Sequence, residues 1–140
     1  MYMSIEKRLE KIEEDVYNMF ETLCCEGNSE QIESFIVQYN IDCSSQARLV
    51  NYDEGLFLQI IAKRNDLELL KLLIKYGADI HICDDFVLSL VALKGYIDLL
   101  EYLLLDCKMD YKSIMKTNAY NNHYKTKQYM DDYIKSNNLV

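Results

Sequence analysis

Apolar residues recur along this chain at the spacing of amphipathic α-helices. In residues 66–76 two Leu-Leu pairs stand three positions apart, and in residues 98–105 two such pairs stand four positions apart. This spacing places the leucines on one broad face at the helical period, with polar residues opposite. Both segments are therefore predicted to be helices that bury one face.

The two helices belong to longer segments, 62–79 and 92–107, that align with an offset of 30 residues. In each, a shorter apolar helix comes first, at Leu56–Ala62 or Phe86–Ala92, and a tight turn follows it. A weaker copy lies at 25–42, and a degenerate fourth copy is predicted in the tail. A helix-turn-helix unit of this size cannot bury its apolar face alone, so stacked units, as in a solenoid, are predicted.

The chain also carries residues suited to end helices and to close a stack. Gly77 and Asn40 stand where two helices should stop, because glycine and asparagine tolerate a left-handed backbone at least cost. Ser4 is a predicted N-cap for an amphipathic N-terminal helix. The apolar face of that helix repeats every three or four residues, at Ile5, Leu9, Ile12, Val16, Met19, Phe20 and Leu23. We interpret this helix and the tyrosine-rich tail from Tyr111 as terminal caps.

The amino-acid composition further limits the possible fold classes and functions. The 140 residues include no proline and only four glycines, which favours helices, and the predicted fold class is all-α. The net charge of -8 argues against a general nucleic-acid binder, although lysines and tyrosines interleave in the tail. No apolar stretch is long enough to cross a membrane. Five cysteines, an odd number without metal-site spacing, favour reduced thiols in a cytosol.

The segment 65–79, with Asp66-Leu67-Glu68-Leu69-Leu70 and the ending Tyr76-Gly77-Ala78-Asp79, resembles the second helix and Gly-Ala-Asp end of an ankyrin repeat. It looks most like the short, degenerate repeats of giant DNA viruses. The resemblance implies an α-solenoid of about three to four ankyrin-type repeats with amphipathic caps, in one domain spanning 1–140. Its parts would be an N-terminal cap and first inner helix at 4–26, repeats at 16–44, 52–83 and 84–110, and a capping repeat at 111–140.

Two departures from the family pattern bear on the repeat boundaries. The usual Thr-Pro-Leu-His start is replaced by Leu56-Phe57-Leu58-Gln59 and by Phe86-Val87-Leu88-Ser89. Cys107-Lys108-Met109-Asp110 stands where Gly-Ala-Asp would stand. The helix-turn-helix pattern persists in spite of both changes.

Ankyrin repeats are protein-binding scaffolds that usually lack catalysis, so the resemblance implies a non-catalytic module that binds a host or viral protein. Hairpin tips and inner helices would line its concave face. The corresponding positions here are Tyr52, Asp53, Glu54, Lys63, Arg64, Asp84, Asp85, Phe86, Leu93 and Lys94. One hypothesis is a basic stripe of Lys63, Arg64 and Lys94 with Phe86 and Tyr52 as aromatic anchors. The alternative is that these charges are merely solvated and that Phe86 packs into the core.

Other functions find less support in the residues. His81 and Cys83 are two positions apart in a segment expected to be extended, but no third group that would orient a catalytic pair is evident. No glycine-rich phosphate loop is present, and neither a cofactor nor a metal is predicted. A second hypothesis is self-association, in which exposed apolar ends, Leu103–Leu105 among them, would form homo-oligomers.

Overall fold

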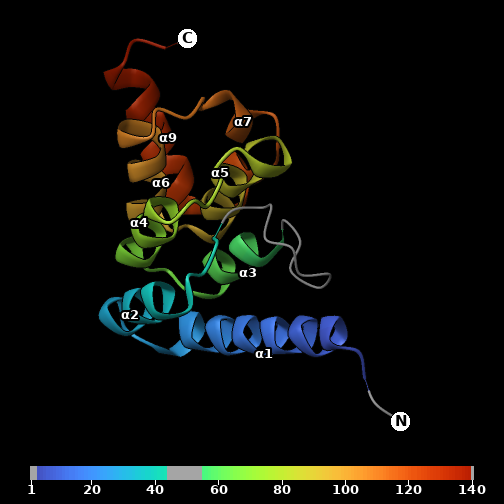
Figure 1. Ribbon diagram of the computed structural model, residues 1–140. Helices are drawn as coiled ribbons and strands as arrows, with labels where there is room; N and C mark the ends of the chain where they lie inside the picture. Colours follow the sequence, from blue (N-terminus) through green and yellow to red (C-terminus); the bar gives the residue numbers. More distant parts are fainter. Residues whose placement is uncertain (1–2, 44–54, 140) are drawn as a thin grey trace. The chain divides into compact units, whose positions relative to one another are not determined.

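Helices account for every regular element among the residues that the structure, a computed structural model, describes: 3–43 and 55–139. In chain order they are α1 (Ile5–Glu26), α2 (Ser29–Tyr39), α3 (Gly55–Lys63), α4 (Leu67–Lys75), α5 (Ile82–Lys94), α6 (Ile97–Glu101), the π-helical turn η1 (Tyr102–Asp106), α7 (Lys112–Met115), α8 (Ala119–Asn122) and α9 (Tyr124–Ser136) (Figure 1). For these residues the prediction of an all-α fold is confirmed.

Local signals explain where several helices begin and end. Ser4 caps α1 as predicted, because its Oγ accepts the backbone N–H of Lys7 at 3.2 Å. Asn28 begins α2 through a capping box: its Oδ1 accepts the N–H of Gln31 at 2.8 Å, and the Gln31 side chain accepts the N–H of Asn28 at 3.0 Å. The predicted stops are also confirmed, with φ of 50° at Asn40 and 108° at Gly77.

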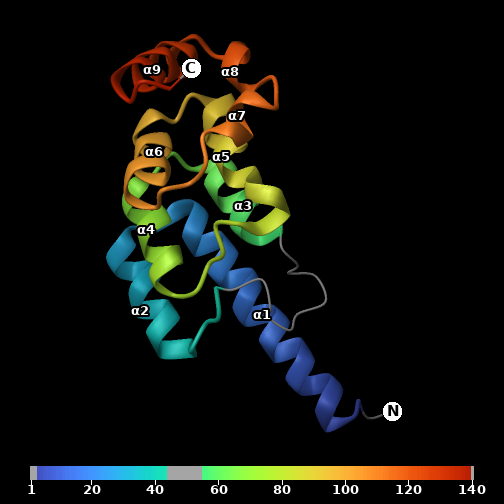
Figure 2. The ribbon, with the colours of Figure 1, turned by 90° about the horizontal axis from the view of Figure 1, so that it is seen from above.

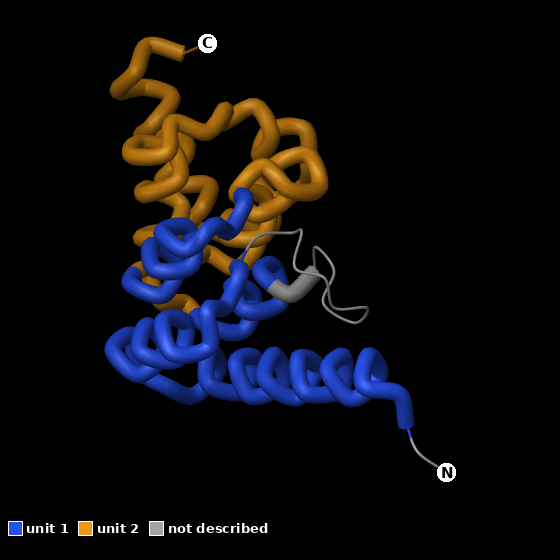
Figure 3. The backbone as a smooth tube through the Cα atoms, viewed as in Figure 1, with its two compact units in different colours: residues 1–64, 68–79 blue, residues 65–67, 80–140 orange. Residues whose placement is uncertain are grey.

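The described helices fall into two compact units. Residues 1–64 and 68–79 form unit 1, and residues 65–67 and 80–140 form unit 2 (Figure 3). Unit 1 thus contains α1 to α3 and nearly all of α4, and unit 2 contains α5 to α9.

In unit 1, α1 packs against α2 and α3 through aromatic and aliphatic side chains. The Phe20 and Phe35 rings stack with centroids 6.1 Å apart. The buried apolar residues of the unit include Phe20, Cys24, Ile32, Ile36, Phe57, Ile60, Ile61, Leu69, Leu70 and Leu73. At the end of α4, Lys75 Nζ and the Tyr76 hydroxyl both donate to Glu33 Oε2, at 3.1 and 3.2 Å, and so join α4 to α2.

The N-terminal half of α1 extends beyond α2 (Figure 2), so its apolar side chains remain in solvent. Ile5, Leu9 and Ile12 are exposed, whereas Phe20 is buried. The C-terminal half of α1 therefore covers the core of unit 1. Among the described residues of this unit, the apolar stripe in the N-terminal half stays largely exposed.

In unit 2, α5 packs against α6, α7 and α8, and α9 packs against α6 and α8. The buried apolar residues include Val87, Leu88, Val91, Ala92, Leu99, Leu100, Leu103, Ile114, Ala119 and Met130. The buried hydroxyl of Thr126 donates to the carbonyl of Ala92 and so joins α9 to the end of α5. The C-terminal segment therefore contributes to the core of this unit.

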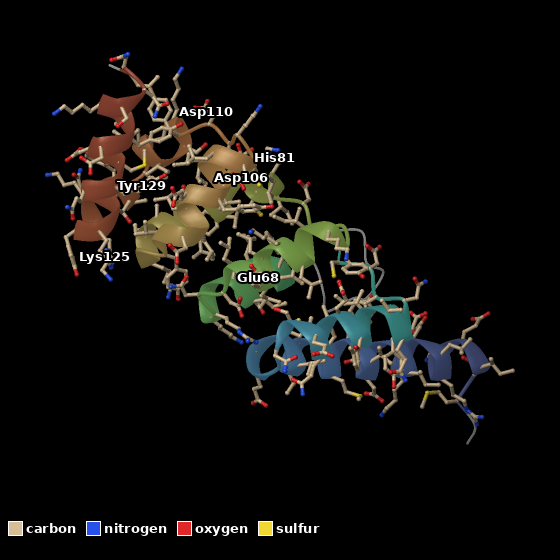
Figure 4. The ribbon with its side chains drawn as sticks, turned by 90° about the vertical axis from the view of Figure 1, so that its left-hand side faces the viewer. Glu68, His81, Asp106, Asp110, Lys125 and Tyr129 are labelled. Atoms are coloured by element: carbon tan, nitrogen blue, oxygen red, sulfur yellow. The ribbon has the colours of Figure 1, made fainter. Side chains whose placement is uncertain are left out.

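Tyrosine side chains of the C-terminal tail take part in this packing, as expected for residues that combine an apolar ring with a polar hydroxyl. The rings of Tyr129 and Tyr133 on α9 stack with centroids 6.3 Å apart, and Tyr111 lies 6.0 Å from Tyr133. Tyr129 is labelled on α9 in Figure 4. Burial, with the Glu101 carboxylate nearby, raises the pKa of Tyr129 to about 12. The phenol therefore remains neutral and tolerates its half-buried position.

Candidate functional site

The outer face of α5 is an apolar surface exposed to solvent. Phe86 is 42% exposed and Leu93 is 38% exposed, although both are large apolar side chains. Leu90, four residues after Phe86 and three before Leu93, is half-buried on the same face. We call these three residues the α5 face. The opposite side of the helix, with Leu88, and the flank with Val87 and Val91 are fully buried. The helix α5 is therefore apolar on two sides, and only one of them contributes to the core.

A left-handed turn precedes this face. Cys83, Asp84 and Asp85 have φ of 52°, 55° and 63°, so the right-handed part of α5 begins only at Phe86. Asp85 is anchored within the turn, because its Oδ1 lies 2.6 Å from His81 Nδ1 and its N–H donates to the His81 carbonyl at 3.4 Å. This segment was expected to be extended, and that expectation is wrong. Aspartate is one of the few residues that adopts a left-handed backbone readily, which local sequence spacing does not reveal.

Charges flank the α5 face at both of its ends. The carboxylates of Asp84 and Asp85 stand before the first right-handed turn, where the helix dipole favours negative charge. Lys94, in the last turn, is exposed and lies where the dipole favours positive charge. The face therefore presents an acidic end, an apolar centre and a basic end. Five of the residues predicted from the sequence lie here: Asp84, Asp85, Phe86, Leu93 and Lys94.

Lys63 and Arg64 lie in unit 1, in different surroundings. Arg64 Nη1 donates to the backbone carbonyl of Cys24 at 3.0 Å, close to the C-terminal end of α1. Lys63 Nζ lies 3.9 Å from Glu21 Oε1 in an exposed ion pair, which contributes little to stability. Arg64 therefore has a structural contact that the hypothesis of a basic stripe did not include.

The remaining predicted residues, Tyr52, Asp53 and Glu54, lie outside the described residues. Conversely, sequence reasoning missed Leu90 as part of the α5 face. Its position between Phe86 and Leu93, at helical spacing from both, was the signal that could have identified it.

The cysteine thiols differ in burial and in their neighbouring groups, and both affect their reactivity. Cys24 and Cys43 lie in unit 1, and burial raises the pKa of each thiol to about 12. Cys83 is exposed, two residues from His81, whose ring is paired with Asp85. Among the described residues no three histidine, cysteine or acidic side chains are grouped so that they could hold a metal ion.

The difference between these thiols gives a testable prediction. On the native protein at neutral pH, an alkylating reagent should modify Cys83 readily and Cys24 only after unfolding. The reason is that Cys24 is 0% exposed and its raised pKa leaves almost no reactive thiolate. Peptide mass spectrometry over a time course measures both rates. Equal rates at the two positions would contradict the packing of α1.

None of the described helices combines the length and the apolar character needed to cross a bilayer. The finding agrees with the charge found along every long helix.

Comparison with known proteins adds one finding. Residues 58–85 match the ankyrin repeat family, from the middle of α3, through α4, to the left-handed turn before Phe86. Neither a curated protein nor a solved structure matches the chain. Ankyrin repeats in general are protein-binding modules. The chain therefore carries one ankyrin repeat, at residues 58–85.

Proposed function

We propose that this protein is a non-catalytic interaction module that binds another protein through the α5 face. The observation that carries the proposal is the exposure of Phe86 and Leu93 directly after the ankyrin repeat, which ends at residue 85. Aromatic and aliphatic side chains that remain in solvent on one face of a helix mark interaction surfaces, because their burial in a partner is favourable.

The flanking charges suggest what kind of partner surface fits. Asp84 and Asp85 at one end and Lys94 at the other would meet basic and acidic groups around an apolar pocket. Such rim charges contribute more to orientation and association rate than to affinity. The apolar centre supplies most of the binding energy, since hot spots gather in the desolvated middle of an interface.

Two finer parts of the proposal depend on the resemblance of the wider chain to ankyrin repeats. One is that helix pairs on either side of residues 58–85 are further, degenerate repeats, so that three to four units form a solenoid. The other is that Lys63 and the hairpin tips contribute to the same concave face, in a host or viral setting. The spacing of 30 residues between the two leucine-rich segments supports the first.

The test begins with capture of binding proteins from a cell lysate on immobilised wild-type protein. The affinity of the captured protein is then measured for Phe86→Asp/Leu93→Asp. Loss of the two apolar contacts should weaken binding by at least ~30-fold, the effect of one hot-spot residue. Both side chains are partly in solvent, so circular dichroism should show a folded variant.

The matched control is Leu105→Asp in η1, because Leu105 is 48% exposed and belongs to another helix of the same unit. This variant should bind as the wild type does. Equal binding by the double variant would exclude the α5 face, and failure of the wild type to capture any protein would count against a binding function. Arg64 is left unchanged, because its reversal would also remove the bond to Cys24.

A further inference from the structure

A second apolar surface, separate from the α5 face, runs along α1. Its residues repeat with alternating steps of four and three from Ile5 to Leu23, and we call them the α1 seam: Ile5, Leu9, Ile12, Val16, Met19 and Leu23. Ile5 is 74% exposed, Leu9 55%, Ile12 58% and Met19 55%. The first half of the seam lies in the part of α1 that extends beyond α2 (Figure 2).

The seam is not the side of α1 that holds unit 1 together. That role belongs to a different side, on which Phe20 and Cys24 are buried and the Tyr17 hydroxyl contacts the backbone of Asp42. On a helical wheel this packed side lies roughly 90° from the centre of the seam, at 100° per residue. Among the residues of unit 1 that the structure describes, most of the seam therefore stays exposed.

At its C-terminal end the seam enters an open groove between α1 and α2. The groove has a volume of about 670 Å³, and Met19, Leu23 and Phe35 are the large apolar side chains in its lining. Seam and groove lie on the same side of α1, because Met19 and Leu23 belong to both. Together they form one continuous apolar track about 28 Å long, at 1.5 Å per residue.

The spacing of the track indicates what fits against it. Apolar residues at alternating steps of four and three form the a and d positions of a two-stranded coiled coil, whose natural occupant is another helix of the same period. Among the described helices of this chain, α1 itself has that pattern over its whole length. The second helix of the pair would then come from a second copy of the chain.

Charges beside the seam select the orientation of the two helices. With Leu9 at position a, Arg8 occupies g and Glu13 occupies e. In a parallel pair, g of one helix faces e five residues further along the other, so Arg8 meets Glu13 of the second copy, twice by symmetry. In an antiparallel pair with the seams fully overlapped, Glu13 faces Glu13 and Asp15 faces Asp15. Like charges in these places are unfavourable.

We propose that two copies of this chain associate through their α1 seams as a parallel two-stranded coiled coil. The partner helix covers the exposed residues of the seam and fills the groove beside Phe35. This self-association uses unit 1, whereas the α5 face lies in unit 2, so it goes beyond the proposed binding function and does not depend on it.

The test is the mass in solution, measured by sedimentation equilibrium over a range of concentrations. The wild type should reach twice the 16.5 kDa of one chain. Leu9→Glu/Ile12→Glu should remain at the mass of one chain while circular dichroism shows an unchanged fold, because both side chains are in solvent in the single chain. The matched control is Val37→Glu on α2, where an apolar residue 66% exposed lies outside the seam and should leave the dimer intact.

Two outcomes would overturn the proposal. One is a wild type that stays at the mass of one chain up to a concentration of ~1 mM. The other is a Leu9→Glu/Ile12→Glu variant that dimerises as the wild type does.

A charge exchange tests the orientation separately. Arg8→Glu and Glu13→Arg should each weaken the dimer, and an equimolar mixture of the two variants should restore it, because both pairs across the mixed dimer are then opposite in charge. In an antiparallel pair with a different, shorter overlap, Glu13 would face Glu6, and Glu13→Arg would then strengthen the dimer. Strengthening of the dimer by Glu13→Arg alone would therefore contradict the parallel arrangement.

Discussion

Replacement of Leu100 by alanine should lower the free energy of unfolding by ~2–5 kcal/mol, whereas the same change at Leu105 should alter it by less than ~0.5 kcal/mol. The two leucines lie in the continuous helical stretch that α6 and η1 form. Leu100 is 0% exposed and Leu105 is 48% exposed. Truncation of Leu100 leaves a cavity in the core of unit 2, whereas Leu105 is about half in solvent and its truncation leaves no enclosed cavity.

Urea denaturation of the two variants and the wild type, followed by circular dichroism, measures the difference. The comparison isolates the effect of burial, because the two variants share the residue type, the substitution and the helical stretch. Equal destabilisation by the two substitutions would contradict the orientation of this helix.

Replacement of Gly95 by alanine should also be strongly destabilising, by about 2–5 kcal/mol, for two separate reasons. Gly95 has φ of 70°, a left-handed conformation that costs an alanine roughly 1–2 kcal/mol. In addition, a Cβ at this position would lie against the ring of His123, closer than van der Waals contact allows. His123 also caps α9, where its Nδ1 accepts the N–H of Lys125 at 3.2 Å, and this hydrogen bond restrains the ring.

A double-mutant cycle separates the two causes. In a His123→Ala background the ring is absent, so Gly95→Ala should cost only the ~1–2 kcal/mol of the left-handed backbone. His123→Ala alone should cost ~0.5–2 kcal/mol through loss of the cap. If Gly95→Ala lowers the free energy of unfolding by as much without His123 as with it, the result would contradict the close approach of α9 to the end of α5.

Features that depend on local chemistry could be predicted from the sequence. The start of α1 at Ser4 and the stops at Asn40 and Gly77 follow from which side chains tolerate or supply a cap, and all three are present in the structure. The paired leucines likewise predicted two helices, α4 and the α6–η1 stretch, because helical periodicity requires only the order of residues.

Features that depend on distant residues could not be predicted in this way. The bond from Arg64 to the carbonyl of Cys24 joins positions 40 residues apart, and no local pattern indicates it. The left-handed run at Cys83–Asp85 has a different origin: it is local, and the pairing of His81 with Asp85, four residues apart, arises only once the chain has turned. For this reason the segment was wrongly expected to be extended.

The apolar stripe of α1 shows a different limit. A helix that packs on its own core and a helix that packs on a second copy carry the same sequence pattern. The structure shows which side of α1 the core of unit 1 uses, because it buries Phe20 and leaves Leu9 and Ile12 in solvent. On α5, similarly, the sequence indicated Phe86 and Leu93 by resemblance, but only the burial of the opposite side shows which face remains open.

The most direct test of the central claim, that this protein binds another protein through the α5 face, is hydroxyl-radical footprinting with and without the captured partner. The method reports the solvent exposure of individual side chains. The account predicts that oxidation of Phe86 and Leu93 falls when the partner is bound, while oxidation of the exposed Leu105 stays the same. Unchanged oxidation of Phe86 and Leu93, with protection confined to other residues, would contradict it.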